Sequence, residues 1–420
     1  MKKVYIETNG CAVIRHDTQR YSKFFRLNGW KEIDSAGDAD LIIMTTCGVI
    51  ESNEQFALDS IVRIKSEMKT GAQLVVGGCI PKINPEKIND IFNGIIFSAR
   101  EEDILNRLID AKIKIDDIYF DGNIFREHSF GDPRIVYSEK ELDQLAAVQK
   151  LSQKFKDPEF IEIYDYLTAG RHFWKEKDLF EVKVAEGCSY SCSYCGTKRA
   201  RGNLKSRDPE QILNEFKFGA KNYPKILLIG DEVGEYGIDI GSSLVDLLDK
   251  LMPVAPSSRI ALRYVSPNSL LRQFNALESY FETGQIYFIC SAFQSGSPKI
   301  LELMNRTPNI DAFVSKIKEM ELKFPFVYKH TQIIVGFPQE TEEDFQCTLD
   351  LLRACQFDYV TVSRYSDRPH TKSSKLEGKI APEIINNRYE KARKVVEDIR
   401  EKRFWSKINK KLVKNVKNTQ

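Results

Sequence analysis

Three cysteines stand close together in the stretch "EGCSYSCSYCG" (186–196), and their spacing is the first chemical signal of the chain. Cys188, Cys192 and Cys195 are spaced C-x3-C-x2-C and offer three thiolates to a metal. Structural zinc closes at four ligands, commonly in paired spacings, and the five histidines show no such pairs. A [4Fe–4S] cluster on three thiolates would leave one iron open for a substrate. Zinc, or a core stripe on a helix, remains an alternative, although the surrounding glycines and serines indicate a loop.

A second set of cysteines is spread over the first eighty residues. Cys11, Cys47 and Cys79 each follow a short apolar segment, "KVYIET", "DLIIMTT" and "QLVVGG" respectively, which we interpret as strands. In an open α/β sheet the loops at the carboxyl ends of parallel strands share one edge, where ligands bind. We therefore expect these three thiols to converge; the alternative is three unrelated loop cysteines.

The other cysteines and the composition set the background. Cys290, Cys347 and Cys355 lie in apolar segments, and we predict that they belong to the core. The 420 residues carry a net charge of only +2, and the N-terminus has no apolar signal segment. No apolar run approaches the ~18 residues that span a bilayer. We expect a cytoplasmic protein without membrane contact, in which thiols stay reduced.

The alternation of strand and helix patterns predicts the fold class. In the first hundred residues it predicts a doubly wound parallel sheet. The first helix should start near Asp17 and end at Gly29. Its apolar stripe is predicted to consist of Tyr21, Phe24, Phe25 and Leu27. From Phe180 the alternation resumes with six strands, fewer than the eight of a closed barrel, so we expect a partial (β/α)6 barrel. Those strands are "FEVKVA", "KILLIG", "RIALRYV", "QIYFIC", "KHTQIIVGF" and "FDYVTVS".

Four parts follow from this organisation. Residues 1–114 would form an α/β domain, 115–178 an inserted linker or lid with helices at 138–155 and near 160–167, 179–375 the barrel, and 376–420 a C-terminal helix with a basic tail. The helix is predicted from Pro382 to about Trp405. The tail after it is either a solvated helix end or a contact for RNA or phosphate.

Several motifs together resemble one family. Tyr194 before the last cysteine makes the loop look like the radical S-adenosylmethionine (SAM) signature. "GCSYSCSYCGTKRARGNLKSR", "LIGDEVGEYGID", "QSGSPKILELMNR", "IIVGFPQETEEDF" and "YSDRPHT" resemble motifs of the radical SAM methylthiotransferases, in order. "TNGC", "ADLIIMTTCGV" and "VVGGC" resemble the N-terminal domain of that family. The resemblance covers roughly residues 1–110 and 180–375.

The resemblance implies a chemistry for both cysteine sets. Cys188, Cys192 and Cys195 would hold the [4Fe–4S] cluster that cleaves SAM, and Cys11, Cys47 and Cys79 an auxiliary [4Fe–4S] cluster. One SAM would methylate a sulfur at the auxiliary cluster. A second would give the 5′-deoxyadenosyl radical that removes hydrogen from the substrate, whose radical takes the methylthio group. An electron donor such as flavodoxin or ferredoxin is implied.

The same resemblance implies which residues contact SAM. Gly230, Asp231 and Glu232 end a strand and would meet the amine, while Gln294 and Ser295 could reach the ribose or carboxylate. Gly336 would let the backbone approach the adenine, with Phe337 beside it. The alternative for each is an ordinary loop residue at a strand end. The basic candidates for the SAM carboxylate are Arg201, Arg207 and Arg263.

The sequence also departs from the family pattern. Ile14 stands where the family usually has asparagine, and His370 where it has glycine. Family members usually continue into a small β-rich RNA-binding domain, whereas the residues after Thr371 read as a helix and a basic tail. Known substrate classes of the family are a modified adenosine in tRNA, an aspartate of a ribosomal protein and ribosomally made peptides.

From these departures we expect a monomeric enzyme that inserts a methylthio group into a peptide or protein, with residues 115–178 as a docking or lid element. The alternatives are a tRNA adenosine methylthiotransferase, a two-cluster enzyme that crosslinks or oxidises peptides without transferring sulfur, and a zinc-bearing RNA-binding module.

Overall fold

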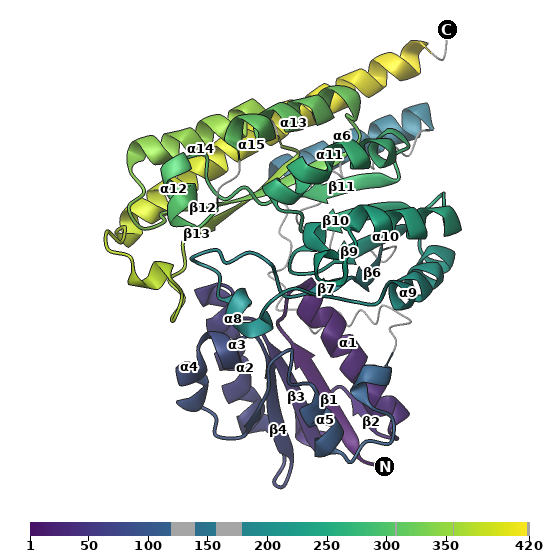
Figure 1. The fold of residues 1–420 in the computed structure, drawn as a ribbon, viewed down its shortest axis with the longest axis vertical. Coiled ribbons are helices and arrows are strands. Elements are labelled where there is room, and N and C mark those ends of the chain that lie inside the picture. Colours follow the sequence, from purple (N-terminus) through teal and green to yellow (C-terminus); the bar gives the residue numbers. More distant parts are fainter. Residues whose placement is uncertain (119–138, 157–178, 307–308, 356, 418–420) are drawn as a thin grey trace. The chain divides into compact units, whose positions relative to one another are not determined.

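A computed structural model describes residues 1–118, 139–156, 179–306, 309–355 and 357–417. It confirms the predicted fold class, with a five-stranded parallel sheet, a six-stranded parallel sheet and a C-terminal helix (Figure 1). None of the described helices combines the length and apolar composition that crossing a membrane requires.

The first sheet has the strand order β2-β1-β3-β4-β5, and its neighbouring strands all pair in parallel. The central strand β3 is buried along its whole length, as expected where helices cover both faces of a parallel sheet. Its strands are β1 (Lys3–Thr8), β2 (Lys31–Ile33), β3 (Leu41–Thr46), β4 (Gln73–Gly78) and β5 (Ile95–Ile96).

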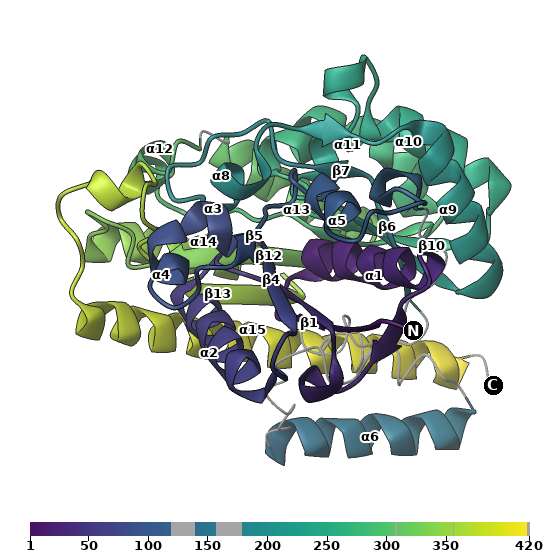
Figure 2. The same cartoon turned by 90° about the horizontal axis from the view of Figure 1, so that it is seen from below.

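Helices cover this sheet on opposite faces (Figures 1 and 2). On one face, α1 (Ala12–Leu27) and α5 (Asp103–Leu108) bury Phe24, Phe25 and Leu105 against the strands. On the other, α2 (Glu51–Glu67) and α4 (Pro85–Asn89) close a second apolar core. The short helix α3 (Ile80–Ile83) follows β4 directly.

The start of α1 differs from the prediction. The helix begins at Ala12 with Cys11 as its N-cap, so Asp17 lies inside it rather than near its start. A Cβ atom on Gly10 would lie 2.1 Å from Ile14 Cγ2, so the glycine lets the chain turn into the helix this early. Leu27 is 47% exposed, and its assignment to the apolar stripe was wrong. Gly29, with φ +81°, follows the helix end as predicted.

The second sheet runs in the order β13-β12-β11-β10-β9-β6, the sequential order expected of a partial barrel. Its strands are β6 (Leu179–Lys183), β9 (Lys225–Ile229), β10 (Arg259–Arg263), β11 (Ile286–Cys290), β12 (Tyr328–Val335) and β13 (Tyr359–Arg364). A small antiparallel pair, β7 (Ala185–Glu186) and β8 (Lys205–Ser206), lies outside this sheet.

Helices alternate with these strands, and side chains cap several of them. Asp208, Ser243, Ser266, Ser297 and Asn309 each accept a hydrogen bond from a backbone N–H in the first turn that follows. The helices are α6 (Glu139–Phe155), α8 (Thr197–Arg201), α9 (Pro209–Asn222), α10 (Leu244–Leu251), α11 (Pro267–Glu282), α12 (Pro298–Leu303), α13 (Ile310–Lys323), α14 (Glu342–Cys355) and α15 (Pro382–Lys417). The last is longer than predicted.

By their contacts the residues divide into two units. The first comprises Met1–Gly131, Leu179–Tyr264 and Ser366–Leu376, and the second Asp132–Asp178, Val265–Tyr365 and Glu377–Gln420. The four-part division expected from the sequence stays a prediction. The helix expected near 160–167 lies outside the described residues.

Two of the three predicted core cysteines are buried. Cys290 and Cys355 are inside, but Cys347 is exposed. Cys347 is wrongly predicted because α14 buries Phe345, Leu349 and Leu352, which leaves position 347 on the outer side of the helix.

Candidate functional site

The three N-terminal cysteines lie at the carboxyl ends of three adjacent strands. Cys47 and Cys79 come directly after β3 and β4, and Cys11 follows the end of β1 by three residues. Cys47 and Cys79 are each 2% exposed, whereas Cys11 is half-buried. The strand pairing therefore brings together three thiols that are 32 to 68 positions apart in the sequence.

The surroundings of these thiols are tightly bonded. The Cys79 N–H donates to the Thr46 carbonyl at 2.8 Å, and the Cys47 N–H donates to Asn9 Oδ1 at 2.9 Å. Ile14, which replaces the usual asparagine of the family, packs with Ile83 and Ala200 against Cys79, and Cys11 lies against the same cluster. An apolar side chain at position 14 thus lines the cysteine set instead of offering it a polar group.

Burial favours the protonated thiol at Cys47 and Cys79. Burial, followed by the charge of Cys11, raises the pKa of Cys47 to about 11, and burial also raises the pKa of Cys79. The Arg201 guanidinium opposes both shifts. Metal binding must therefore displace protons from this set.

The other three cysteines share one loop between β7 and α8. Backbone bonds fix this loop: the Cys188 N–H donates to the Gly202 carbonyl at 3.3 Å, and the Cys195 N–H donates to the Cys192 carbonyl at 3.1 Å. All three are half-buried. Burial, followed by the Glu232 carboxylate, raises the pKa of Cys188 to about 12, and burial raises the pKa of Cys195.

The two cysteine sets are close neighbours within the first unit, because α3 packs on α8. Cys79 is the N-cap of α3, and α8 begins two residues after Cys195. Ala200 of α8 packs in the same cluster as Cys79, and a Cβ atom on Gly196 would lie 3.2 Å from Ile83.

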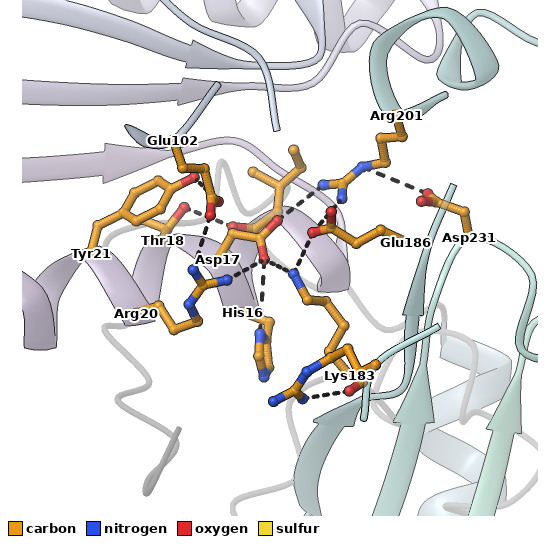
Figure 3. Close-up of polar contacts among 12 residues, drawn as sticks. His16, Asp17, Thr18, Arg20, Tyr21, Glu102, Lys183, Glu186, Arg201 and Asp231 are labelled. Atoms are coloured by element: carbon orange, nitrogen blue, oxygen red, sulfur yellow. Dashed lines mark hydrogen bonds and ion pairs between the residues drawn. The ribbon is translucent and has the colours of Figure 1, made fainter. Parts of the chain in front are cut away.

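A buried network of charged side chains joins α1 to residues that flank the second cysteine loop (Figure 3). Its centre is Asp17, which is 2% exposed. The Lys183 ammonium forms hydrogen bonds with both Asp17 and Glu186. On the other side, Arg20 Nη2 lies 2.9 Å from a Glu102 oxygen, and the Tyr21 hydroxyl donates to the same carboxylate.

Arg201 connects this network to the cysteine loops. Its side chain is 1% exposed, and its guanidinium nitrogens lie 3.2 Å from Asp17, 3.7 Å from Glu186 and 3.6 Å from Asp231. Asp231 in turn accepts a 2.8 Å hydrogen bond from the N–H of Gly187, the residue before Cys188. One buried cation thus links α1, which starts after Cys11, with the loop that holds the other set.

The pKa shifts follow from burial and from these pairs. Burial alone would raise the pKa of Asp17, but Lys183, His16, Arg201 and Arg20 outweigh it and hold that pKa well below its ordinary value. At Asp231 burial wins and raises the pKa, although Arg201 opposes it. Strongly perturbed groups of this kind gather at functional sites more often than elsewhere.

A cavity of about 570 Å3 borders the network, with Arg20, Glu102, Lys183, Glu186 and Arg207 in its wall. Cations and carboxylates are nearly balanced there. The wall therefore favours no particular class of ligand.

Of the residues predicted to contact SAM, Asp231 and Glu232 both act on the start of the cysteine loop. Asp231 is already occupied by Gly187 and Arg201. Glu232 is 6% exposed, and its charge acts on Cys188. Gly230 directly follows β9 in a buried position. Tyr194 is half-buried in the loop itself. Their contact with SAM stays a prediction.

The three basic candidates have different surroundings. Arg201 is buried among three carboxylates, as described above. Arg207 donates to both oxygens of Glu215, at 2.7 and 2.8 Å, so binding SAM would require breaking a bidentate pair. Arg263 ends β10 and hydrogen-bonds the Tyr264 hydroxyl. These geometries give Arg201 and Arg207 structural partners that the sequence did not reveal.

The last four candidates lie in the second unit. Gln294, with φ +80°, is pinned beside β12 by backbone hydrogen bonds to Gln332 and Ile334. Ser295 is fully buried, with its hydroxyl 3.2 Å from that of Thr348. Phe337 is also fully buried. A Cβ atom on Gly336 would lie 2.4 Å from Ile385, so packing against α15 accounts for this glycine without an adenine.

The donor sets fit clusters better than single ions. Across the described ranges, no three His, Cys, Asp or Glu side chains gather tightly enough to hold one metal ion. A cluster makes a different demand, because each thiolate binds a different iron. Each of the two sets consists of three cysteines and no histidine, which suits an iron–sulfur cluster.

Sequence reasoning missed the network residues Asp17, Lys183 and Glu186. Asp17 was interpreted as a helix start because aspartate is common there. A usable signal was available in β6, where Glu181 and Lys183 interrupt a strand that is otherwise apolar and fully buried.

Comparisons with known proteins agree with both halves of the chain. Residues 3–98 match the uncharacterised protein family UPF0004, and residues 182–352 match the radical SAM superfamily. The radical SAM match implies a [4Fe–4S] cluster and SAM. A solved cobalamin-dependent SAM radical enzyme, OxsB, matches with a TM-score of 0.53 and 13% identity. The match covers 95% of this chain and 56% of that one, and it shows the fold alone.

Curated relatives identify the family. A probable threonylcarbamoyladenosine tRNA methylthiotransferase of Pyrococcus abyssi is 31% identical over 381 residues, which cover 89% of this chain and 79% of the relative. A tRNA-2-methylthio-N(6)-dimethylallyladenosine synthase of Bacillus licheniformis is 28% identical, over 96% of this chain and 74% of the relative. The chain is an enzyme that belongs to the radical SAM methylthiotransferases.

Proposed function

We propose that this enzyme replaces a hydrogen of an N6-modified adenosine in tRNA by a methylthio group. The main support is that the chain is similar, along nearly its whole length, to enzymes that modify tRNA. Their names give tRNA nucleosides as products or substrates. The peptide or protein substrate expected from the sequence finds no support among these relatives. We therefore adopt the tRNA alternative.

The proposal requires two clusters, one on Cys188, Cys192 and Cys195 and one on Cys11, Cys47 and Cys79. The first would supply the electron that cleaves SAM, and the second would hold the sulfur. The adjacency of the two sets through α3 and α8 supports this, because a radical made at one set must act close to a sulfur held at the other.

The atoms balance with two SAM molecules, one sulfur and an external electron donor such as flavodoxin or ferredoxin. The substrate loses one C–H hydrogen, which leaves in 5′-deoxyadenosine together with methionine. The second SAM gives its methyl to the sulfur and leaves as S-adenosylhomocysteine. The substrate radical would form the C–S bond with the methylated sulfur, and the electron released by that bond would pass to the auxiliary cluster, which balances the electron used to cleave SAM.

The chain's own residues would position these partners. Glu232, whose charge acts on Cys188, would meet the SAM amine, a role that suits a carboxylate. Asp231 holds the Gly187 N–H and thereby the start of the cysteine loop. Ile14, Ile83 and Ala200 keep water from Cys79, because they cover it with apolar surface.

The experiment is a product assay with the anaerobically reconstituted full chain. Substrates are tRNA carrying threonylcarbamoyladenosine, tRNA carrying dimethylallyladenosine and a synthetic ribosomal-protein peptide containing the aspartate. We expect one tRNA nucleoside to gain about 46 Da, the mass of SCH3 replacing H. S-adenosylhomocysteine and 5′-deoxyadenosine should appear with it.

Modification of the peptide with both tRNAs unchanged would contradict the tRNA proposal. A nucleoside product that contains no sulfur, formed without S-adenosylhomocysteine, would contradict methylthio transfer itself. The matched control is the same chain with Cys11, Cys47 and Cys79 replaced by alanine, which should make no methylthio product from any substrate.

A further inference from the structure

The C-terminal helix α15 of the second unit borders a strongly cationic cavity. The cavity measures about 650 Å3, and five of its eight lining side chains are cations while one is an acid. Those lining residues are Glu321, Arg353, Ile399, Lys402, Arg403, Ser406, Lys407 and Lys410. A cavity of this charge selects a polyanion.

The floor of the cavity is held by a buried carboxylate. Asp358 is fully buried, and it lies 2.6 Å from Arg403, 3.0 Å from Lys407 and 3.2 Å from Lys329. Glu321 shares two of these cations, with Arg403 at 2.8 Å and Lys329 at 2.9 Å. Three cations thus lie against two carboxylates in this floor.

The pKa of Lys407 reflects its burial among these charges. Burial lowers the pKa of Lys407 to about 8, Asp358 opposes that shift, and repulsion from Lys329 and Arg403 adds to it. An anion bound in the cavity would relieve this repulsion. Arg403 and Lys407, at the start of the basic tail, are therefore not part of a freely solvated helix end.

The rim of the cavity adds further positive charge. Lys402 and Lys410 are exposed, two turns apart on α15. Within the described part of the chain neither of them forms an ion pair. Arg353 is also at the rim, but it pairs with Asp350 at 2.9 Å.

An exposed aromatic ring stands beside these lysines. A second cavity of about 920 Å3 shares Lys402, Ser406 and Lys410 with the first, and it is also lined by Trp405 and by the acids Asp398 and Glu401. Trp405 is 42% exposed. Aromatic rings next to a cationic groove are the usual platform on which unpaired bases stack.

We propose that these two cavities along α15 form an RNA-docking surface, in which Lys402, Lys410 and the charged floor hold backbone phosphates and Trp405 stacks on a base. This proposal rests on the proposed tRNA substrate and extends it to a binding site. An acidic redox protein would also complement the positive charge, but it would not need a large exposed ring between two lysines. The test below therefore includes a result that would identify a redox protein as the partner.

The experiment measures binding of bulk tRNA to the full-length reconstituted enzyme as salt is raised. The double variant Lys402→Ala/Lys410→Ala should lower the slope of log affinity against log salt by about 2, one unit for each phosphate that the enzyme no longer neutralises. The matched control, Lys391→Ala/Lys394→Ala, removes the same charge from exposed positions on the same helix outside both cavities. It should leave the slope unchanged.

Two further arms separate the alternatives. Trp405→Ala should weaken binding of single-stranded RNA several-fold without changing the salt slope. If the control pair reduces the slope as much as the test pair, or if neither does, the surface is not the docking site. If the test pair slows reduction by flavodoxin and leaves tRNA binding intact, the proposal is overturned in favour of a redox partner. Because salt slopes do not depend on turnover, a failed product assay would contradict the proposed reaction and not this surface.

Discussion

The two cysteine sets use the same ligands and are built in opposite ways. Cys188, Cys192 and Cys195 share one short loop, where hydrogen bonds with near neighbours in sequence fix the spacing. Cys11, Cys47 and Cys79 come from three strands and meet because the strands pair. The first set is therefore visible in the sequence as a motif, and the second as a repeated position.

Their electrostatic surroundings are also opposite. Beyond burial, the charge that acts most strongly on Cys79 is the Arg201 cation, whereas on Cys188 it is the Glu232 carboxylate. A cation stabilises the more negative, reduced state of a cluster, and an anion destabilises it. We expect the N-terminal cluster to be the more readily reduced for this reason.

The largest effect should come from removing each set in turn. Replacement of Cys188, Cys192 and Cys195 by alanine should leave about four of about eight irons and abolish SAM cleavage. Replacement of Cys11, Cys47 and Cys79 should leave the same amount of iron but preserve 5′-deoxyadenosine formation without sulfur transfer. Iron analysis and product chromatography check both. Identical losses from the two triple variants would contradict the division of roles.

The next largest effect, on stability and on reduction potential, should come from replacing the buried cation Arg201. Arg201→Gln leaves Asp17 and Asp231 without their shared partner, so it should destabilise the fold by about 3–5 kcal/mol. It should also make the N-terminal cluster harder to reduce. Denaturant unfolding measures the loss of stability. Potentiometric EPR measures the reduction potential of the N-terminal cluster, in a variant that also lacks Cys188, Cys192 and Cys195.

Two further variants isolate the charge of Arg201. Arg201→Lys keeps the charge and should keep the potential. Arg199→Gln removes an exposed charge from the same helix and should change neither property. An unchanged potential in Arg201→Gln would restrict Arg201 to a structural role.

At the loop of Cys188, Cys192 and Cys195 we expect a smaller change in reduction potential, of opposite sign. Glu232→Gln removes the carboxylate beside Cys188, so the barrel cluster should become easier to reduce. The loss of a charged hydrogen bond to the SAM amine, worth about 1.5–3 kcal/mol, should weaken SAM binding by roughly 10- to 100-fold. Equilibrium dialysis measures binding, and the iron content should stay the same. Unaltered SAM affinity would remove Glu232 from the binding site.

The smallest effect is predicted outside both sets. Cys347→Ser changes an exposed thiol and should alter stability by less than about 0.5 kcal/mol, with iron content unchanged. The matched variant Cys290→Ser, at a fully buried strand end, should destabilise by about 1–3 kcal/mol because it buries a hydroxyl. A loss of iron in Cys347→Ser would show that this thiol takes part in metal binding.

Most of the fold was predictable because the strands are short apolar runs separated by clear helix patterns. The errors lie where tertiary contacts override a local preference. Asp17 has the residue type of a helix start but lies buried inside α1. Leu27 has the spacing of the apolar stripe of α1 but is 47% exposed.

The peptide or protein substrate expected from the sequence, which the named relatives do not support, rested in part on the net charge. A net charge of +2 averages over the chain and does not show where charges gather. Arg403, Lys407 and Lys410 line one cavity, and their common location becomes apparent when α15 is placed beside Asp358 and Glu321.

The sequence by itself determined the family, the two cysteine sets and the alternation of strands and helices, because these depend on spacing along the chain. The tertiary structure decided the charge around each set. Asp17 meets Lys183 across 166 positions and Arg201 across 184. No local pattern records which of 62 cations will neutralise a given carboxylate. That choice is made when strands pair and burial forces each charge to find a partner.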